Sequence, residues 1–540
     1  MDRGDQLLHA LSYNWQKKAP HKDPMRLRNL CMVQLTTSVT HAIKSKADRT
    51  CKGFQQMCDM LKTLPLELKT IVVQETTASQ VINDHSTFSR ILLLHLLSDV
   101  EQISIISDAA SGSSINFSKE ECIELLEKLD SVSSFSILGL HLEGVTFAKG
   151  VLSEIISRSP KLSSIHINGE EAATEVLAFI AKNPRGLHSL HLDDCSVSDR
   201  DVVNALVKSY KEADYWGDTE FTSINDPDID GDFPPLCHLS IQSPSVTVCG
   251  AVVLLHYLRN LKSLQYSYWN SSICNLLYYL QKQSPKAAPF SLTSMSLWCV
   301  TEKSLDTLKF CPNLQYLMME CTNPALASME ALKNLPKLCS LTLRLIPEEL
   351  IVSALKAVGK QLVHLHIEFE EYARTPIKWQ TIQAIHAHAR NIKRLELHHI
   401  NIVTESGDTI APLHSPFFSE LCHLNLSSVD LQPALLSRIL CKNASLETLV
   451  LDINQEALTD SAVMALVKNN QFNHLYDIYI RRGSLSTLSI TNLMTLPSLE
   501  KVAIQLSQFP SLSAGTFSLI QNQIMKGNYR CRLENDDKDE

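Results

Sequence analysis

A six-residue pattern, LxxLxL, recurs along most of the chain and constrains the fold more than any other feature of the sequence. Four nearly regular copies begin at Leu187, Leu338, Leu421 and Leu446. Looser copies, with other apolar residues in place of some leucines, begin at Ile137, Leu162, Leu236, Leu261, Leu292, Leu314, Leu362, Ile392, Leu475 and Leu499. A fainter copy is formed by Val100, Ile103 and Ile105. Repetition of this kind indicates a chain built from stacked, similar units.

Successive clear copies start 22 to 31 residues apart, except for one step of 49 residues between Leu187 and Leu236. Most of these steps resemble the period of leucine-rich repeats, roughly 20–29 residues, and the long step has room for a degenerate unit or an insertion. The alternation within LxxLxL predicts a short strand with its leucines toward the core. Prolines that end the intervening helical stretches stand just before several strands, as Pro160, Pro312, Pro336 and Pro497 do.

The predicted fold is therefore an α/β leucine-rich-repeat solenoid with an α-helical N-terminal region. A parallel inner sheet and outer helices should form a horseshoe similar to that of ribonuclease inhibitor. Residues 1–110 are expected to be short helices, and residues 111–506 to hold about fourteen irregular repeats, with an acidic loop at 211–232. Residues 507–540 should form a C-terminal cap followed by a disordered acidic tail.

Composition argues against several classes of function. The net charge of −9 over 540 residues differs from the basic balance of nucleic-acid binders. No stretch is long and apolar enough for a membrane span, and the N-terminus lacks the pattern of a signal peptide. The 15 cysteines show no regular pairing, as expected in a reducing compartment. We therefore expect a cytoplasmic or nuclear protein, or one present in both, that binds neither nucleic acid nor membrane.

Motifs of catalysis and cofactor binding are missing from the sequence. It contains no GxGxxG, GxxxxGK[ST], HExxH or GxSxG and no CxxC pair. The run Asp226, Asp228, Asp230 imitates the beginning of a calcium loop, but Cys237 stands where such a loop needs a bidentate glutamate. We therefore predict that the protein is not an enzyme, with no catalytic residue, no cofactor and no metal ion.

The residues between the leucines of each strand should face away from the core, on the concave side of the sheet. Histidine holds the middle position in three successive repeats, at His141, His166 and His191, and His366 holds it further along. Such columns could bind a metal ion or make partner binding depend on pH. The simpler interpretation is that this surface must be polar and that histidine is one tolerated choice.

A second set of surface candidates consists of Tyr266, Trp298, Tyr316 and Met318. Exposed tyrosine, tryptophan and methionine are enriched at protein interfaces and at residues that dominate binding. The alternative is that insertion loops fold over these side chains and bury them. We predict that the concave surface, anchored by this patch, holds a protein substrate or partner.

An N-terminal stretch carries a more specific pattern. Leu27, Cys31 and Leu35 are spaced four residues apart, so they form one apolar stripe on a predicted helix. This stripe resembles the box with which VHL-type substrate receptors bind Elongin C, where leucine and cysteine enter the partner. One departure is Arg26, at a position that is usually small, serine or threonine.

About thirty residues further on come Leu64, Pro65 and Leu68, in the sequence LPLEL. Their position after the box resembles the proline-containing helix that contacts the cullin. A second proline typical of cullin-5 boxes is absent, since Glu67 follows Leu66, which favours cullin 2. Together with the repeats, the pattern is similar to the PRAME-like substrate receptors of cullin-RING ubiquitin ligases. That resemblance implies a substrate-recognition subunit that docks Elongin B/C and cullin 2.

Two other interpretations stay open. The N-terminal stretches could be ordinary amphipathic helices that cap the first repeat, in which case the protein is a non-ligase scaffold or an inhibitor that binds a protein on its concave face. LPxEL also opens many F-boxes, which would make the chain an adaptor for Skp1. The second alternative is weaker, because no tryptophan lies between Trp15 and Trp216, where the third F-box helix is expected.

Overall fold

The structure is a computed structural model that describes residues 35–536 with gaps. The gaps of six residues or more are 41–51, 79–90, 107–114, 128–133, 207–234, 267–276, 282–288 and 406–416, and shorter ones occur elsewhere. The chain forms two compact units, Met1–Ser271 and Ser272–Glu540. The acidic loop predicted at 211–232 lies outside the described residues. No helix among the described residues is long and apolar enough to cross a membrane.

Unit 1 contains a parallel sheet of six strands in chain order. They are β1 (Gln102–Ile106), β3 (Gly139–Glu143), β5 (Ser164–Asn168), β6 (Ser189–Asp193), β7 (His238–Ile241) and β8 (Ser263–Tyr266). The main helices are α3 (Lys52–Lys62), α4 (Leu66–Ala78), α7 (Val151–Ser157), α8 (Glu170–Lys182), α9 (Asp199–Leu206) and α10 (Val248–Tyr257). A short pair, β2 (Ile115–Asn116) and β4 (Val145–Thr146), lies beside them.

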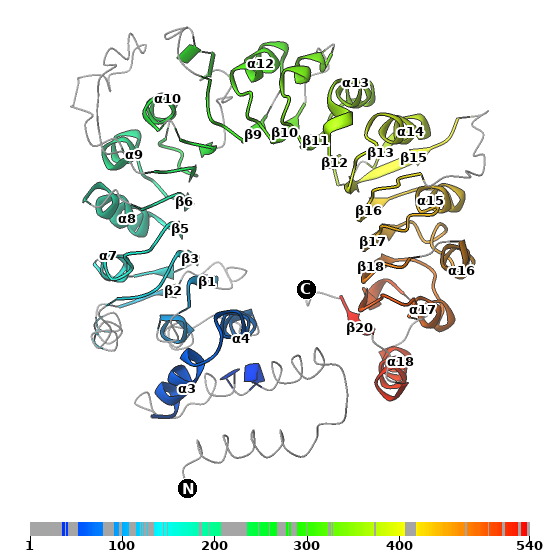
Figure 1. The fold of residues 1–540 in the computed structure, drawn as a ribbon, viewed down its shortest axis with the longest axis horizontal. Coiled ribbons are helices and arrows are strands. Elements are labelled where there is room, and N and C mark those ends of the chain that lie inside the picture. The colour runs from blue at the N-terminus through cyan, green and yellow to red at the C-terminus, as the bar shows by residue number, and fades with distance from the viewer. Residues whose placement is uncertain are drawn as a thin grey trace. The chain divides into compact units, whose positions relative to one another are not determined.

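Unit 2 contains a second parallel sheet, of ten strands. They are β9 (Ser294–Leu297), β10 (Tyr316–Glu320), β11 (Ser340–Arg344), β12 (His364–Glu368), β14 (Arg394–His398), β16 (His423–Val429), β17 (Thr448–Ile453), β18 (Asp477–Arg482), β19 (Lys501–Ile504) and β20 (Arg532–Asn535). The α-helices are α12 (Glu302–Thr307), α13 (Glu348–Val358), α14 (Trp379–His388), α15 (Pro433–Ile439), α16 (Asp460–Asn469), α17 (Thr487–Leu493) and α18 (Ala514–Gly527). Within each unit the helices that alternate with the strands, α7 to α10 and α12 to α17, lie on one side of the strands (Figure 1).

The repeat leucines occupy equivalent places in successive strands. In unit 2, Leu341 pairs in register with Leu365, which pairs with Leu395, which pairs with Leu424. All four side chains are fully buried. One repeat cannot bury its own apolar face, so the stack of aligned leucines forms a shared core between strands and helices. The prediction of a leucine-rich-repeat solenoid with parallel strands and helices behind them is confirmed. We call the sheet face turned away from the helices the inner face of each unit.

Two features of the fold differ from the expectation. The strands form two sheets, and β8 and β9 share no ladder among the described residues. This break coincides with the 31-residue step between Leu261 and Leu292. The acidic tail is also ordered where it begins, because Glu534 belongs to β20, which pairs with β19. The strand is held by buried Leu533 and by an ion pair of 2.6 Å between Lys501 Nζ and Glu534 Oε2.

Candidate functional site

The inner face of unit 1 carries the predicted histidine column. His141, His166 and His191 are register partners on β3, β5 and β6. The rings of His141 and His166 stack with centroids 4.0 Å apart and an angle of 3°, and His191 follows with its centroid 5.3 Å from that of His166. Parallel strands stand about 4.8 Å apart, so identical residues at register positions meet in this way.

Acidic neighbours accompany this column. His166 Nε2 lies 2.7 Å from Asp193 Oδ2, and His141 Nε2 lies 3.6 Å from Glu143 Oε2. Burial, together with the proximity of His166, lowers the pKa of both His141 and His191. Because desolvation disfavours the charged form, these two imidazoles are neutral at pH 7. At neutral pH these two imidazoles therefore offer uncharged hydrogen-bond donors and acceptors on the inner face of unit 1.

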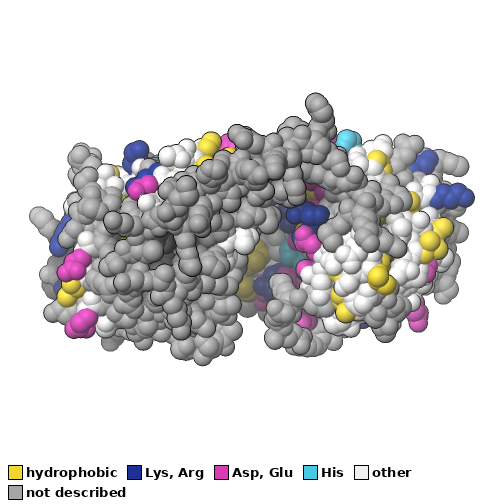
Figure 2. Space-filling view, turned by 90° about the horizontal axis from the view of Figure 1, so that it is seen from below, with side chains coloured by type: hydrophobic (Ala, Val, Ile, Leu, Met, Phe, Trp, Pro, Cys, Tyr) yellow, Lys and Arg dark blue, Asp and Glu magenta, His cyan; other side chains and the backbone are white. Residues whose placement is uncertain are grey.

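The inner face of unit 2 carries the predicted aromatic patch. Tyr316 on β10 is 52% exposed and Trp298, just after β9, is 46% exposed. Met318 is half-buried on the same face as Tyr316. The guanidinium carbon of Arg344 lies 5.8 Å from the centre of the Trp298 ring. Tyr266 ends β8 in unit 1, and its side chain lies outside the described residues. Among the coloured side chains, Figure 2 shows hydrophobic, charged and histidine groups on one face of the molecule.

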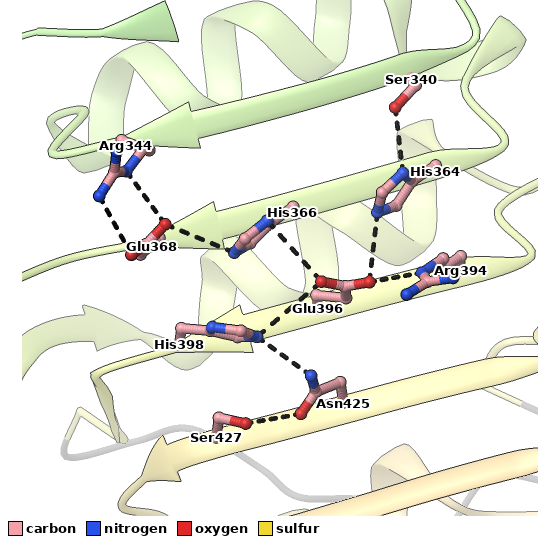
Figure 3. A network of polar contacts seen from close by, with 10 residues as sticks. All are labelled: Ser340, Arg344, His364, His366, Glu368, Arg394, Glu396, His398, Asn425 and Ser427. Atoms are coloured by element: carbon pink, nitrogen blue, oxygen red, sulfur yellow. Dashed lines mark hydrogen bonds and ion pairs between the residues drawn. The ribbon is translucent and has the colours of Figure 1, made fainter. Parts of the chain in front are cut away.

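A denser cluster occupies β12 and β14 on the same inner face (Figure 3). His366 on β12 is the register partner of Glu396 on β14, and His398 is the next residue of β14 on that face. Glu396 Oε2 lies 3.7 Å from His366 Nδ1 and 3.9 Å from His398 Nε2. Glu396 is buried and the two histidines are half-buried. Two imidazoles thus converge on one carboxylate oxygen.

The other oxygen of Glu396 is held by neighbouring side chains. Arg394 Nε donates a hydrogen bond to Glu396 Oε1, and His364 Nε2 lies 3.5 Å from that atom. His364 is itself fixed from the other side, where its Nδ1 lies 3.0 Å from Ser340 Oγ on β11. These contacts orient the carboxylate so that Oε2 faces His366 and His398.

A second carboxylate stands behind His366. Glu368 Oε2 lies 3.7 Å from His366 Nε2 and 3.0 Å from Arg344 Nε. The Nε2 atom of His366 is buried and has no hydrogen-bond partner. A buried polar atom without a partner carries a free-energy cost, so its position calls for an explanation.

The protonation states of the cluster follow from its surroundings. The imidazole of His364 and the guanidinium of Arg394 hold the pKa of Glu396 well below its ordinary value. Burial lowers the pKa of His366, and burial together with the proximity of His366 lowers the pKa of His398 to about 4. At neutral pH the cluster therefore combines an ionised carboxylate with neutral imidazoles, which are the ligand forms that metal ions require.

The sequence pattern places His366 and, in the next repeat, Glu396 and His398 at strand positions that face away from the core, but it does not show that the three side chains meet. Among the described residues, His366, Glu396 and His398 form the one group of His, Cys, Asp or Glu whose ligand atoms all lie within 4.8 Å of one another. The group joins two repeats, and His366 lies thirty residues before Glu396 in the chain. The available signal was the i, i+2 pair Glu396 and His398 at positions that face away from the core, read together with the register of the preceding repeat.

The N-terminal candidates are described only in part. Leu27 and Cys31 lie outside the described residues, whereas Leu35 is half-buried in a helical stretch. Leu64 is half-buried and Pro65 is exposed just before α4, and Leu68 is half-buried within that helix. Between them, the side chain of Leu66 is 43% exposed. The start of α4 therefore presents apolar surface to solvent.

Comparisons with known proteins find only distant structural similarity. No protein-family model matches it, and no curated protein does. Among solved structures, an internalin (inlF) from Listeria monocytogenes is 15% identical, with a TM-score of 0.33, over 65% of this chain and 88% of its own. Rad7 in complex with Elc1 from yeast is 13% identical, with a TM-score of 0.39, over 93% of both chains. TLR13 bound to ssRNA13 is 15% identical, with a TM-score of 0.34, over 82% of this chain and 54% of its own. Likenesses this distant carry no argument about function.

Proposed function

We propose that the protein is a protein-binding scaffold whose partner docks on the inner face of the repeats. The observation that carries this proposal is the exposure of Trp298 and Tyr316 beside Arg344 on the inner face of unit 2. Tryptophan, tyrosine and arginine are the residues that most often dominate the free energy of protein association. Exposed aromatic rings in a monomer are unfavourable in water, and a partner that covers them removes that cost.

The surroundings of the aromatic residues suit a protein surface. Glu320, Arg344 and Glu368 follow one another across β10, β11 and β12 on the inner face and form ion pairs of 3.7 and 3.0 Å. An apolar anchor beside paired charges is the usual anatomy of an interface, with an aromatic centre and a polar rim. Cross-linking of the chain to its captured partner tests this arrangement. Cross-links that map to the helix side of unit 2, and none near β10 and β11, would contradict it.

As the finer role, we propose a substrate-recognition subunit of a cullin-RING ubiquitin ligase that docks Elongin B/C and cullin 2. Two features support this role: the spacing of Leu27, Cys31 and Leu35, and the apolar surface at Pro65 and Leu66, where α4 begins. An anchor helix of this kind must present leucine to its partner, and a 43% exposed Leu66 is available for contact. In this role the N-terminal features would contact Elongin B/C and cullin 2, and the inner faces would be available to the substrate.

Purified components test the ligase role directly. The full chain is mixed with Elongin B/C, with Skp1, and with Elongin B/C plus cullin 2, and each mixture is analysed by size-exclusion chromatography. Co-elution with Elongin B/C, extended by cullin 2, is the expected result. Co-elution with Skp1 alone would favour the F-box adaptor. If neither adaptor co-elutes, the chain is a non-ligase scaffold or inhibitor.

A further inference from the structure

We infer that His366, Glu396 and His398 form a binding site for a divalent transition-metal ion of the zinc class. The three donors are His366 Nδ1, Glu396 Oε2 and His398 Nε2, from two neighbouring strands of the inner face of unit 2. This site goes beyond the proposed scaffold function and does not depend on it, since the ion would bind the isolated chain.

The spacing of the donors fits a small ion. Zinc binds imidazole nitrogen and carboxylate oxygen at about 2.0–2.2 Å, so the donors of a tetrahedral site lie about 3.3 Å apart. The separations of 3.7 and 3.9 Å from Glu396 Oε2 are longer by only a few tenths of an ångström. Small side-chain rotations would close that difference. Neighbouring strands already place the three side chains on one face, so no backbone movement is required.

The identity of the donors selects the class of ion. Two imidazoles and one carboxylate suit zinc, cobalt, nickel or copper, whereas magnesium and calcium prefer a shell of oxygen atoms. Three protein ligands leave at least one coordination position open, as in zinc sites that bind water or a further donor. Because the two histidines are half-buried on the inner face, that position faces the side on which a bound molecule would lie.

The contacts around His366 match the support that metal-bound histidine usually has. A histidine that ligates through one nitrogen normally donates its other N–H to a carboxylate. With Nδ1 on the metal, the orphaned Nε2 of His366 becomes an N–H donor that points at Glu368 Oε2, 3.7 Å away. Metal binding at Nδ1 would thus fix the proton on Nε2, and a small rotation would bring that N–H within hydrogen-bond distance of Glu368.

Asn425 and Ser427 set the tautomer of His398. Ser427 Oγ donates to Asn425 Oδ1 over 2.7 Å, which leaves the amide group of Asn425 to face His398 Nε2 at 3.2 Å. An amide N–H can only donate, so Nε2 of a neutral His398 must be the acceptor, with its lone pair toward Asn425. A metal ion would take that lone pair in place of Asn425.

Nearby positive charges limit the expected affinity of the site for a metal ion. Arg394 contacts Glu396, and Arg344 is shared between Glu368 and Glu320, so two guanidinium groups offset most of the charge of three carboxylates. An incoming dication therefore meets little excess negative charge, and its binding rests mainly on the three ligand bonds. We accordingly expect saturable binding of one ion, weaker than at the closed four-ligand sites of structural zinc proteins.

The test is titration of the full chain with Co²⁺ and with Zn²⁺ alone, followed by visible absorption and calorimetry. One equivalent of Co²⁺ should give weak visible bands of a nitrogen and oxygen site, without the strong near-ultraviolet bands of cysteine thiolate. His366→Ala and His398→Asn should each remove that equivalent. The matched control is His191→Ala, from the histidine column of unit 1, which should retain it. Glu368→Gln should keep the stoichiometry and weaken binding by about tenfold or more.

A measurement on the unchanged protein covers the case in which a variant does not fold. Histidine is modified with diethyl pyrocarbonate with and without Zn²⁺, and each site is quantified by mass spectrometry. Protection of His366 and His398 but not of His191 supports the site. The inference is overturned if the wild-type chain binds no Co²⁺, if folded His366→Ala and His398→Asn retain the wild-type equivalent, or if Zn²⁺ protects neither histidine. None of these results depends on whether a protein partner is ever found.

Discussion

His366 on β12 and Glu396 on β14 lie directly opposite each other in the sheet, with Nδ1 and Oε2 3.7 Å apart. The two residues come from different repeats, so their contact exists only because the solenoid holds neighbouring strands in register. The leucines on the opposite face maintain that register, since each one packs in the stack of the shared core. The alignment of side chains on the inner face therefore depends on the burial of the leucines on the opposite face.

The core of unit 2 should not tolerate a charge. Leu341 is fully buried between register partners on β10 and β12. We expect Leu341→Asp to lower the free energy of unfolding by about 4 kcal/mol or more, because it buries an unpaired carboxylate among leucines. Urea denaturation followed by circular dichroism measures the change. Thr342→Asp, on the inner face of the same strand, is the control and should cost far less.

The stability of unit 1 should depend on the protonation of His95. This side chain is fully buried, its Nε2 lies 3.0 Å from Thr77 Oγ1, and burial lowers its pKa to about 4. The unfolded chain binds a proton near pH 6.5 while the folded chain resists it, so stability is present above pH 6.5 and is lost as the pH falls toward 4.

The loss attributable to this residue should approach about 3 kcal/mol at pH 4, from the fall of its pKa from 6.5 to about 4. Denaturation of the wild-type chain and of His95→Leu at several pH values gives the difference. We expect the gap between the two chains to shift in favour of the variant as the solution is acidified. Parallel pH profiles would show that His95 is not responsible.

Much of the fold follows from local pattern. Each of the fourteen LxxLxL copies leads into a parallel strand, and so does the faint copy at Val100. These strands are predictable because the alternation of apolar residues is complete within six residues of sequence. The same pattern does not predict strand β20, because its one central apolar residue, Leu533, stands among charges in an acidic tail. Its order comes from pairing with β19, a contact that composition does not encode.

The candidate site was less accessible from the sequence. The column of His141, His166 and His191 could be predicted, since regular repeats place the same strand position on one line. The group at His366 could not, because its geometry depends on the side chains of Arg394, His364 and Glu368, which orient the carboxylate and the imidazole. The spacing of residues in the sequence predicts which face of a strand a side chain lies on. Which side chains of neighbouring strands contact one another is seen only in the folded sheet.

The ligase role predicts a specific loss of binding. If Leu27 and Cys31 insert into Elongin C, then Leu27→Ser with Cys31→Phe should remove Elongin B/C from pull-downs, since a buried anchor contributes about 2 kcal/mol or more. The repeats should stay folded, with an unchanged melting temperature. If instead these residues cap the first repeat, the same change should lower the melting temperature. A drop in stability, together with no Elongin recovered by the wild-type chain, would leave the non-ligase scaffold as the better account.

The central claim, that the inner face of unit 2 holds the protein partner, is tested most directly by quantitative affinity purification of three tagged chains in parallel. They are the wild type, Trp298→Ala with Tyr316→Ala, and Leu488→Ala, whose side chain on α17 is 61% exposed on the helix side. We predict that the double variant loses the proteins captured by the wild type while its melting temperature is unchanged, and that Leu488→Ala retains them. Capture of the same partners in the same amounts by the double variant would contradict the claim.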